Sequence, residues 1–473
     1  MAQVSIDQQP LYKTLPIGQQ IMFSVSNTTL VATKYKVKFV AEVYVSNIGI
    51  TYAADELIGT FKTTPNNAGV GIFNLRPILE SFVSPDNEPS SRAEYKLVDF
   101  NVTEFPIHLI DKFSQSDRSI KFFAVRFLIE YADSPTEAVG QPTEQVDSTE
   151  YIFFNGVLQY DDVLTLDNNN YGYDLETNKF TLVDSDSKFL TNAPVIQYAR
   201  LTDYGTLPFL NYSPDPSTGL PIRIQSISLN YYNSEGVFLG AETVDSQTNT
   251  GGSASQGSFS NTRLSYFGAF PGNLRRKPSS VFSALVTAGT IDGGYYTLFA
   301  NAGTAFLYPA SLTYRINILC DNLKGFEPIR LTWLNQWGVW DYYTFNMKST
   351  RTISTNRTSY TQISGTWNDS TFKISGYKGG KKNFRVNSTE KIKLNTDFVS
   401  EAEGLWFEEL INSTEVYIVN GFETDVANTI TNKYIDPVVL TTSSYVKKTI
   451  ANDKLMQYTI EIEKSKMQRT QSV

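Results

Sequence analysis

The chain has 473 residues and a formal net charge of −8, so it is too long for one compact core and lacks the overall basic charge typical of nucleic-acid-binding proteins. The single cysteine, Cys320, excludes an intrachain disulfide or a multi-thiolate metal site, and the single histidine, His108, leaves little material for a catalytic triad. Residues 1–10 do not resemble a secretory signal, and no run approaches the ~18 apolar residues of a membrane span. We therefore expect several domains and no membrane insertion.

Alternation of apolar and polar residues predicts that most of the chain is β-structure. Apolar residues recur at every second position in 36–46 and 458–463, whereas 122–129 is apolar almost throughout and indicates a strand buried on both faces. Segment 75–83, with Pro77 near its first turn, is a candidate short helix. The sequence therefore predicts a mainly-β, multi-domain chain of β-sandwich or barrel-like domains with few short helices.

Shifts in composition predict three domains. Segment 132–149 is acidic and contains two prolines, and 245–261 is rich in Gly, Ser, Asn and Gln, so both indicate loops. A softer shift occurs at 321–325, and residues 464–473 have the composition of a polar tail. We expect an N-terminal domain at 1–150, a middle domain at 151–325 and a C-terminal domain at 326–473.

Segment 326–345, FEPIRLTWLNQWGVWDYYTF, contains three of the five tryptophans of the chain. Its alternation predicts two strands joined by a turn at Asn335, Gln336 and Gly338, with aromatic side chains on both faces. Such a hairpin can belong to a domain core, a subunit interface or a sugar-binding platform. The interface hypothesis predicts that Trp340→Ala folds but does not assemble, and the core alternative predicts unfolding. The interface candidates are Trp333, Trp337, Trp340, Tyr342, Tyr343, Trp406 and Phe407.

No motif indicates a catalytic or metal site. Segment 167–174 is rich in oxygen ligands but fails the EF-hand pattern, and the P-loop and zinc-protease fingerprints are absent. His108 lies in an apolar, strand-like context, which favours a structural role. Two basic turns, 275–277 and 378–385, are typical of solvated loops, and the second is predicted to be a hairpin tip. We expect no enzyme activity, no metal and no cofactor.

Three segments carry a family resemblance: 63–83 (TTPNNAGVGIFNLRPILESFV), 326–345, and 404–463. Together they resemble virion structural proteins of tailed phages that infect Bacteroidetes, including crAss-like podophages. In that family, proteins of this size form stacked rings of the neck and tail barrel. The resemblance implies no catalytic residues.

The resemblance and the composition lead to one expectation and two alternatives. We expect a non-enzymatic ring subunit in the neck or tail of a virion, made in the host cytoplasm and assembled as six or twelve copies beside other tail and neck proteins. DNA would pass through the ring lumen without specific binding. One alternative is a carbohydrate-binding adhesion module, in which Trp337, Trp340 and Tyr343 stack on sugar rings. A glycoside hydrolase ranks below it, because the carboxylates of 161–162 and 401–409 have no context that selects a pair.

Overall fold

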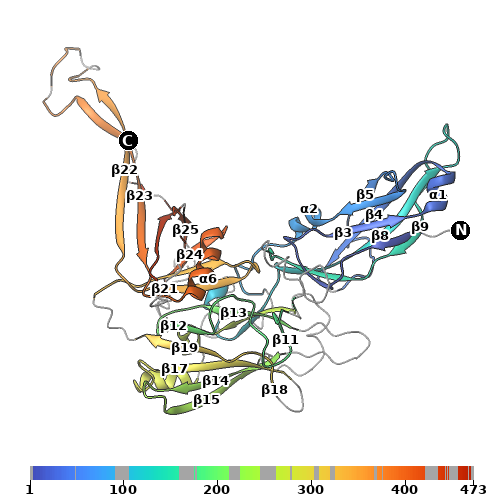
Figure 1. Cartoon of the computed structure of the whole chain (residues 1–473). Coiled ribbons are helices and arrows are strands. Elements are labelled where there is room, and N and C mark those ends of the chain that lie inside the picture. The colour runs from blue at the N-terminus through green and yellow to red at the C-terminus, as the bar shows by residue number, and fades with distance from the viewer. Residues whose placement is uncertain are drawn as a thin grey trace. The chain divides into compact units, whose positions relative to one another are not determined.

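The computed structural model divides the chain into two compact units. The first contains residues 1–320, 334–342 and 421–431, and the second contains 321–333, 343–420 and 432–473. In the described part of the chain, the strands form five sheets, and helices are few and short (Figure 1). The prediction of a mainly-β, multi-domain chain is confirmed. The structure describes residues 4–47, 49–90, 106–158, 175, 178–211, 224–245, 263–276, 280–302, 308–319, 325–366, 370–374, 376–420, 435–442, 444, 446, 456–466, 468 and 469.

Two sheets near the N terminus pack face to face around one apolar core. Buried side chains from both sheets, including Phe23, Phe39, Phe73 and Phe127, meet in this core, which makes the pair a β-sandwich. The first sheet has the order β1 (Ser5–Gln8), β3 (Met22–Ser26), β6 (Val70–Asn74). The second has the order β2 (Thr14–Pro16), β10 (Tyr151–Phe154), β8 (Ile120–Ala132), β4 (Tyr35–Ser46), β5 (Leu57–Thr63), with β9 (Thr143–Asp147) also paired to β8.

Local sequence signals explain these elements. The predicted strands at 36–46 and 122–129 are β4 and β8, and the predicted helix at 75–83 appears as α2 (Arg76–Leu79) followed by the short 3-10 helix Glu80–Phe82, with Pro77 in the first turn. A further helix, α1 (Thr28–Thr33), begins after Asn27, whose side chain accepts a hydrogen bond from the Leu30 amide. The predicted strands at 36–46 and 122–129 and the predicted helix at 75–83 are therefore confirmed.

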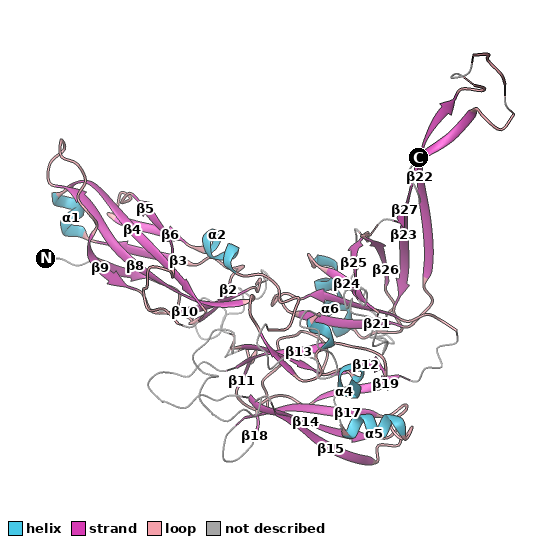
Figure 2. Ribbon diagram, turned by 180° about the vertical axis from the view of Figure 1, so that it is seen from behind, coloured by secondary structure: helices cyan, strands magenta, loops and turns pink. Residues whose placement is uncertain are grey.

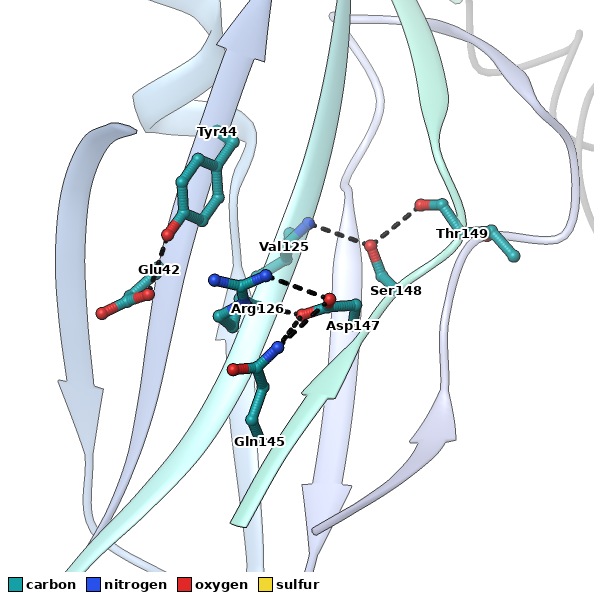
Figure 3. Close-up of polar contacts among 8 residues, drawn as sticks. All are labelled: Glu42, Tyr44, Val125, Arg126, Gln145, Asp147, Ser148 and Thr149. Carbon is teal, nitrogen blue, oxygen red and sulfur yellow. Dashed lines mark hydrogen bonds and ion pairs between the residues drawn. The ribbon is translucent and has the colours of Figure 1, made fainter. Parts of the chain in front are cut away.

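The acidic segment 132–149, predicted as a loop, is a loop only in part. Its second half forms β9, and Arg126 on β8 donates to Asp147 from both Nε and a terminal nitrogen, at 2.8 and 3.2 Å (Figure 3). The Ser148 hydroxyl accepts from the Val125 amide at 2.9 Å. Pairing with a long neighbouring strand overrides a composition that is typical of loops.

Hydrogen bonds to one carboxylate, that of Glu56, hold the loop between β4 and β5. Glu56 is buried, and it accepts hydrogen bonds from the Thr51 and Ala53 amides at 2.9 and 3.1 Å and from the Thr51 hydroxyl at 3.1 Å. Burial raises the pKa of this carboxyl, but the hydrogen bonds to Thr51 and Ala53 outweigh it and hold the pKa below its ordinary value. The folded protein therefore favours the ionised form.

We expect Glu56→Gln to lower the free energy of unfolding by ~1–2 kcal/mol at pH 7, because hydrogen bonds to a charged acceptor are exchanged for weaker ones. Since the folded pKa lies below the unfolded one, the contribution is complete above the unfolded pKa of about 4.3 and is lost as the pH falls through the folded pKa. Urea unfolding at several pH values measures this. The neighbouring Asp55, which is exposed, provides the control Asp55→Asn. Equal unfolding curves for the two variants would contradict the assignment.

The rest of the first unit contains two further sheets. One has the order β11 (Thr181–Leu182), β13 (Thr206–Asn211), β16 (Leu264–Gly268), β7 (Phe113–Gln115). The other has the order β12 (Ile196–Arg200), β19 (Tyr314–Leu319), β17 (Tyr295–Ala302), β14 (Ile224–Tyr232), β15 (Phe238–Asp245), with β18 (Tyr308–Pro309) on β17. The described helices of this part are the 3-10 turn Ile107–Leu109, α4 (Pro271–Arg276) and α5 (Val281–Thr287).

The second unit holds most of the fifth sheet, which has the order β21 (Trp340–Phe345), β20 (Ile329–Leu334), β24 (Val416–Val419), β25 (Ile435–Leu440), β26 (Thr459–Lys464), β23 (Gly380–Asn395), β22 (Thr350–Gln362). Helix α6 (Glu401–Asn412) begins with a capping box between Ser400 and Glu403. Within the predicted polar tail, 464–473, β27 (Gln468–Arg469) pairs with Asn387 and Ser388 of β23.

The three-domain division stays a prediction, with two observations beside it. The N-terminal sheet extends to Phe154, past the expected limit at 150, because β10 pairs with β8. The first unit changes to the second between 320 and 321, near the expected boundary at 325. Apart from residue 245, the predicted loop 245–261 lies outside the described residues. No helix in the described ranges has the length and apolar content needed to span a membrane.

Candidate assembly surface

The predicted interface aromatics are core side chains. Trp333, Trp337, Trp340 and Phe407 have no exposed surface, Tyr342 and Trp406 are 4% exposed, and Tyr343 is half-buried. Another protein therefore cannot touch six of the seven directly. These side chains pack as a domain core, which was one of the predicted alternatives. That another protein covers the surface over them stays a prediction.

The two faces of strand β21 bury their aromatics against different partners. Trp340 and Tyr342 point to one face, where the Trp340 ring nitrogen donates to the Asp86 carbonyl at 2.7 Å and the Tyr342 hydroxyl lies 2.6 Å from His108 Nδ1. Tyr343 points the other way, and its ring centroid lies 4.8 Å from that of Phe407 on α6. Each face of β21 is thus covered by a different part of the chain. The other candidate tryptophans also pack against aromatic rings. The ring centroids of Trp333 and Trp406 lie 4.9 Å apart, and those of Trp337 and Phe180 lie 4.7 Å apart.

His108 is buried, as its sequence context predicted, and the predicted turn at Asn335 is confirmed. The Asn335 side chain accepts from the Trp337 amide at 2.9 Å, and the Gly338 amide donates to the Asn335 carbonyl at 3.0 Å. The described residues contain no group of three or more His, Cys, Asp or Glu that could hold a metal ion. Segments 161–162 and 167–174 lie outside the described residues, and 401–409 lies on α6.

The surface that does stand out is a long hairpin, which we call the arm, residues 350–395. Its strands β22 and β23 pair in antiparallel register from Thr350↔Lys393 to Gln362↔Gly380 and extend well beyond the other strands of their sheet (Figures 1 and 2). Strand β22 is the sheet edge, and every residue from Thr350 to Thr361 is exposed. Between Gly380 and Val386, β23 pairs with β22 and with no other described strand. Residues 357–386, which we call the distal arm, thus form a two-stranded ribbon with solvent on both faces.

The end of the arm, residues 363–379, which we call the tip, exposes large apolar side chains. Ile363, Phe372, Ile374 and Tyr377 are 68%, 61%, 77% and 81% exposed. The tip is nevertheless hydrogen-bonded, since the Thr366 amide donates to the Lys373 carbonyl at 2.9 Å. Sequence reasoning missed these residues. A signal was present, because 350–362 has only two large apolar residues in thirteen and a glycine-rich turn follows at 376–380, a pattern typical of a hairpin without a buried face.

The two paired strands below the tip, residues 357–362 and 380–386, carry four cations and no acidic residue. We call this part the shaft. The predicted hairpin tip at 378–385 is right only in part, because Lys378 and Gly379 lie in the tip whereas 380–385 belong to strand β23 and pair with β22. The other basic turn, 275–277, is instead the end of helix α4 at Arg275 and Arg276, with Lys277 outside the described residues. The shaft cations are Arg357, Lys381, Lys382 and Arg385, all exposed.

Comparisons with known proteins leave the chain without a family assignment. No protein-family model matches it, and no curated protein matches it. Among solved structures, it is similar to the native conformation of Escherichia coli alpha-2-macroglobulin, with 9% sequence identity and a TM-score of 0.19. That match covers 82% of this chain and 22% of the macroglobulin chain. The chain therefore spans about a fifth of that protein's length, and a TM-score this low carries no argument about fold or function.

Proposed function

We propose that the protein is a non-enzymatic structural subunit of a phage virion, which forms a ring of the neck or tail barrel around the DNA channel. The observation that carries the assembly role is the tip, where four large apolar side chains are exposed at the end of a ribbon. The resemblance of segments 63–83, 326–345 and 404–463 supports the virion setting. In this proposal the ring contains six or twelve copies, contacts neighbouring tail and neck proteins, and uses no cofactor.

The energetics of the tip favour a protein partner. Full burial of one large apolar side chain contributes roughly 1.5–3 kcal/mol, so four such side chains can drive association. A two-stranded ribbon alone is marginally stable in water, and a partner surface would add to its stability. If the tip binds a different surface patch on an identical chain, the contact is head-to-tail, and head-to-tail contacts that close produce rings.

No observation favours the adhesion alternative. Trp337 and Trp340, two of its three sugar-stacking residues, are fully buried. In the sheet β12-β19-β17-β14-β15, two neighbouring tyrosines are packed against other side chains. The Tyr232 and Tyr295 rings stack at 4.8 Å, and the Arg315 guanidinium lies 3.6 Å from the Tyr295 centroid.

The test removes the tip. A variant in which Asn-Gly replaces residues 363–379 retains the β22–β23 pairs and closes them with a two-residue turn. Negative-stain microscopy and light scattering at high concentration should show closed rings for the wild type and folded monomers for the variant, because the apolar contact is lost. Circular dichroism and thermal unfolding establish that the variant is folded.

A matched control replaces exposed apolar residues elsewhere. Val237 and Phe238, both 55% exposed in the loop between β14 and β15 and at the start of β15, are changed to serine together, and this variant should still form rings. If the tip variant forms rings as the wild type does, the tip is not the assembly contact. If the wild type forms no ring alone or in the virion, the proposed function is wrong.

A further inference from the structure

The shaft differs from the apolar tip in its charge. Segment 355–387 contains six basic residues and one acidic residue, in a chain whose net charge is −8. The segment therefore has a net charge of +5, whereas the rest of the chain has a net charge of −13. The net charge of the whole chain conceals this separation.

Cations lie on both faces of the shaft. Directly opposed residues in an antiparallel pair share a face, and Thr361 opposes Lys381 while Tyr360 opposes Lys382. Arg357 and Lys381 therefore share one face. A bulge at Phe384 keeps Arg385, opposite Thr358, on the same face as Lys382. A ribbon that is basic on both faces is suited to a ligand that surrounds it with negative charge.

Among the described residues, the shaft cations form no ion pair, in contrast to the cations at the base of the arm. At the base, Arg351 pairs with Glu327 at 2.6 Å and with Glu390 at 2.9 Å, and Lys391 lies 3.8 Å from both Glu461 and Glu463. For the four shaft cations, the described part of the chain provides no ion pair. An anionic ligand would neutralise this positive charge, which no ion pair among the described residues neutralises.

We propose that the shaft binds the phosphate backbone of double-stranded DNA without sequence preference. The setting, a DNA-filled channel, rests on the proposed function, whereas the binding chemistry rests on the shaft alone. A two-stranded antiparallel ribbon fits the major groove of B-DNA, whose two walls are lined with phosphates. Arg and Lys neutralise phosphates, and the interleaved side chains of Thr358, Ser359 and Asn383 can donate to backbone oxygens.

The distribution of apolar residues separates this ligand from an acidic protein surface. The most exposed large apolar side chains of the distal arm lie in the tip, whereas the shaft has only Tyr360 and Phe384, 37% and 49% exposed. Protein interfaces need a desolvated apolar centre, whereas DNA contacts are polar and wet. The shaft therefore matches a polyanion better than it matches a second protein.

The experiment measures binding of a fluorescent 30-base-pair duplex by anisotropy, in several unrelated sequences and at several salt concentrations. The wild type and the tip variant should bind all duplexes equally, and the logarithm of the binding constant should fall with the logarithm of salt with a slope of about −0.9 for each phosphate contacted, or −3 to −4 for four contacts. The variant Arg357→Gln, Lys381→Gln, Lys382→Gln, Arg385→Gln should bind at least tenfold more weakly at low salt, with a slope near zero.

A control removes the same charge elsewhere. Lys13, Lys38, Lys112 and Lys348 are exposed, and their joint replacement by glutamine should leave DNA binding within about twofold of the wild type. Equal binding by the shaft variant and the control would overturn the proposal, as would a wild type that does not bind. A shaft variant that loses ring assembly but retains DNA binding would reassign the cations to a subunit contact. A wild type that binds DNA through the shaft without forming rings would reject the ring function and leave this inference intact.

Discussion

Gly338→Ala is expected to lower the free energy of unfolding by ~3 kcal/mol or more, because an added Cβ would collide with backbone. Gly338 has φ +68° in the turn between β20 and β21. A Cβ there would lie 1.6 Å from the Asn155 carbonyl oxygen and 2.6 Å from its carbon. The neighbouring chain cannot move away freely, since the Val157 amide donates to the Gln336 carbonyl at 2.6 Å. Urea unfolding followed by tryptophan fluorescence measures the loss.

Gly289 provides a matched control with the same backbone conformation and no collision. Its φ is +67°, and nothing lies within 4 Å of an added Cβ. Gly289→Ala should therefore lose only the ~1–2 kcal/mol that left-handed backbone costs a residue with a Cβ. Equal losses at the two positions would show that conformation alone decides the effect and that the contact with Asn155 has no role.

Trp340→Ala is expected to destabilise the fold by ~3–5 kcal/mol rather than to produce a stable, unassembled monomer. The side chain is fully buried, its ring centroid lies 5.0 Å from that of His108, and its ring nitrogen donates to the Asp86 carbonyl. Truncation leaves a cavity and removes the donor from that carbonyl. Thermal and urea unfolding, with size-exclusion chromatography of the folded fraction, measure the result.

Tyr377→Ala is the control for Trp340→Ala, because it removes an aromatic ring of the tip that is 81% exposed. Stability should change by less than ~0.5 kcal/mol, while ring formation weakens. A Trp340→Ala variant with wild-type stability that fails to assemble would restore the interface hypothesis for this residue and contradict its assignment to the core.

Predictions that depend only on residues close together in the sequence were accurate. The alternation in 36–46, the apolar run in 122–129, the proline-containing helix near 76 and the turn at Asn335 all appear as expected. Each rests on side-chain periodicity or on the backbone preference of one residue, which operates over a few positions. Composition was a weaker guide. It indicated a loop at 143–147, where pairing with β8 forms a strand instead, and it gave no sign that 468–469 pair with β23.

By itself, the sequence determined the fold class, the burial of strand β8, and the excess of positive charge in the arm segment. It could not determine whether the aromatics of 326–345 face solvent or core, because their partners are remote in the chain. Trp340 bonds to Asp86 across 254 residues, and Tyr342 contacts His108 across 234. The tertiary structure also decided which apolar residues remain uncovered. Ile374 and Tyr377 are exposed because no other described strand or helix packs against the distal arm, and the absence of a neighbour cannot be deduced from local periodicity.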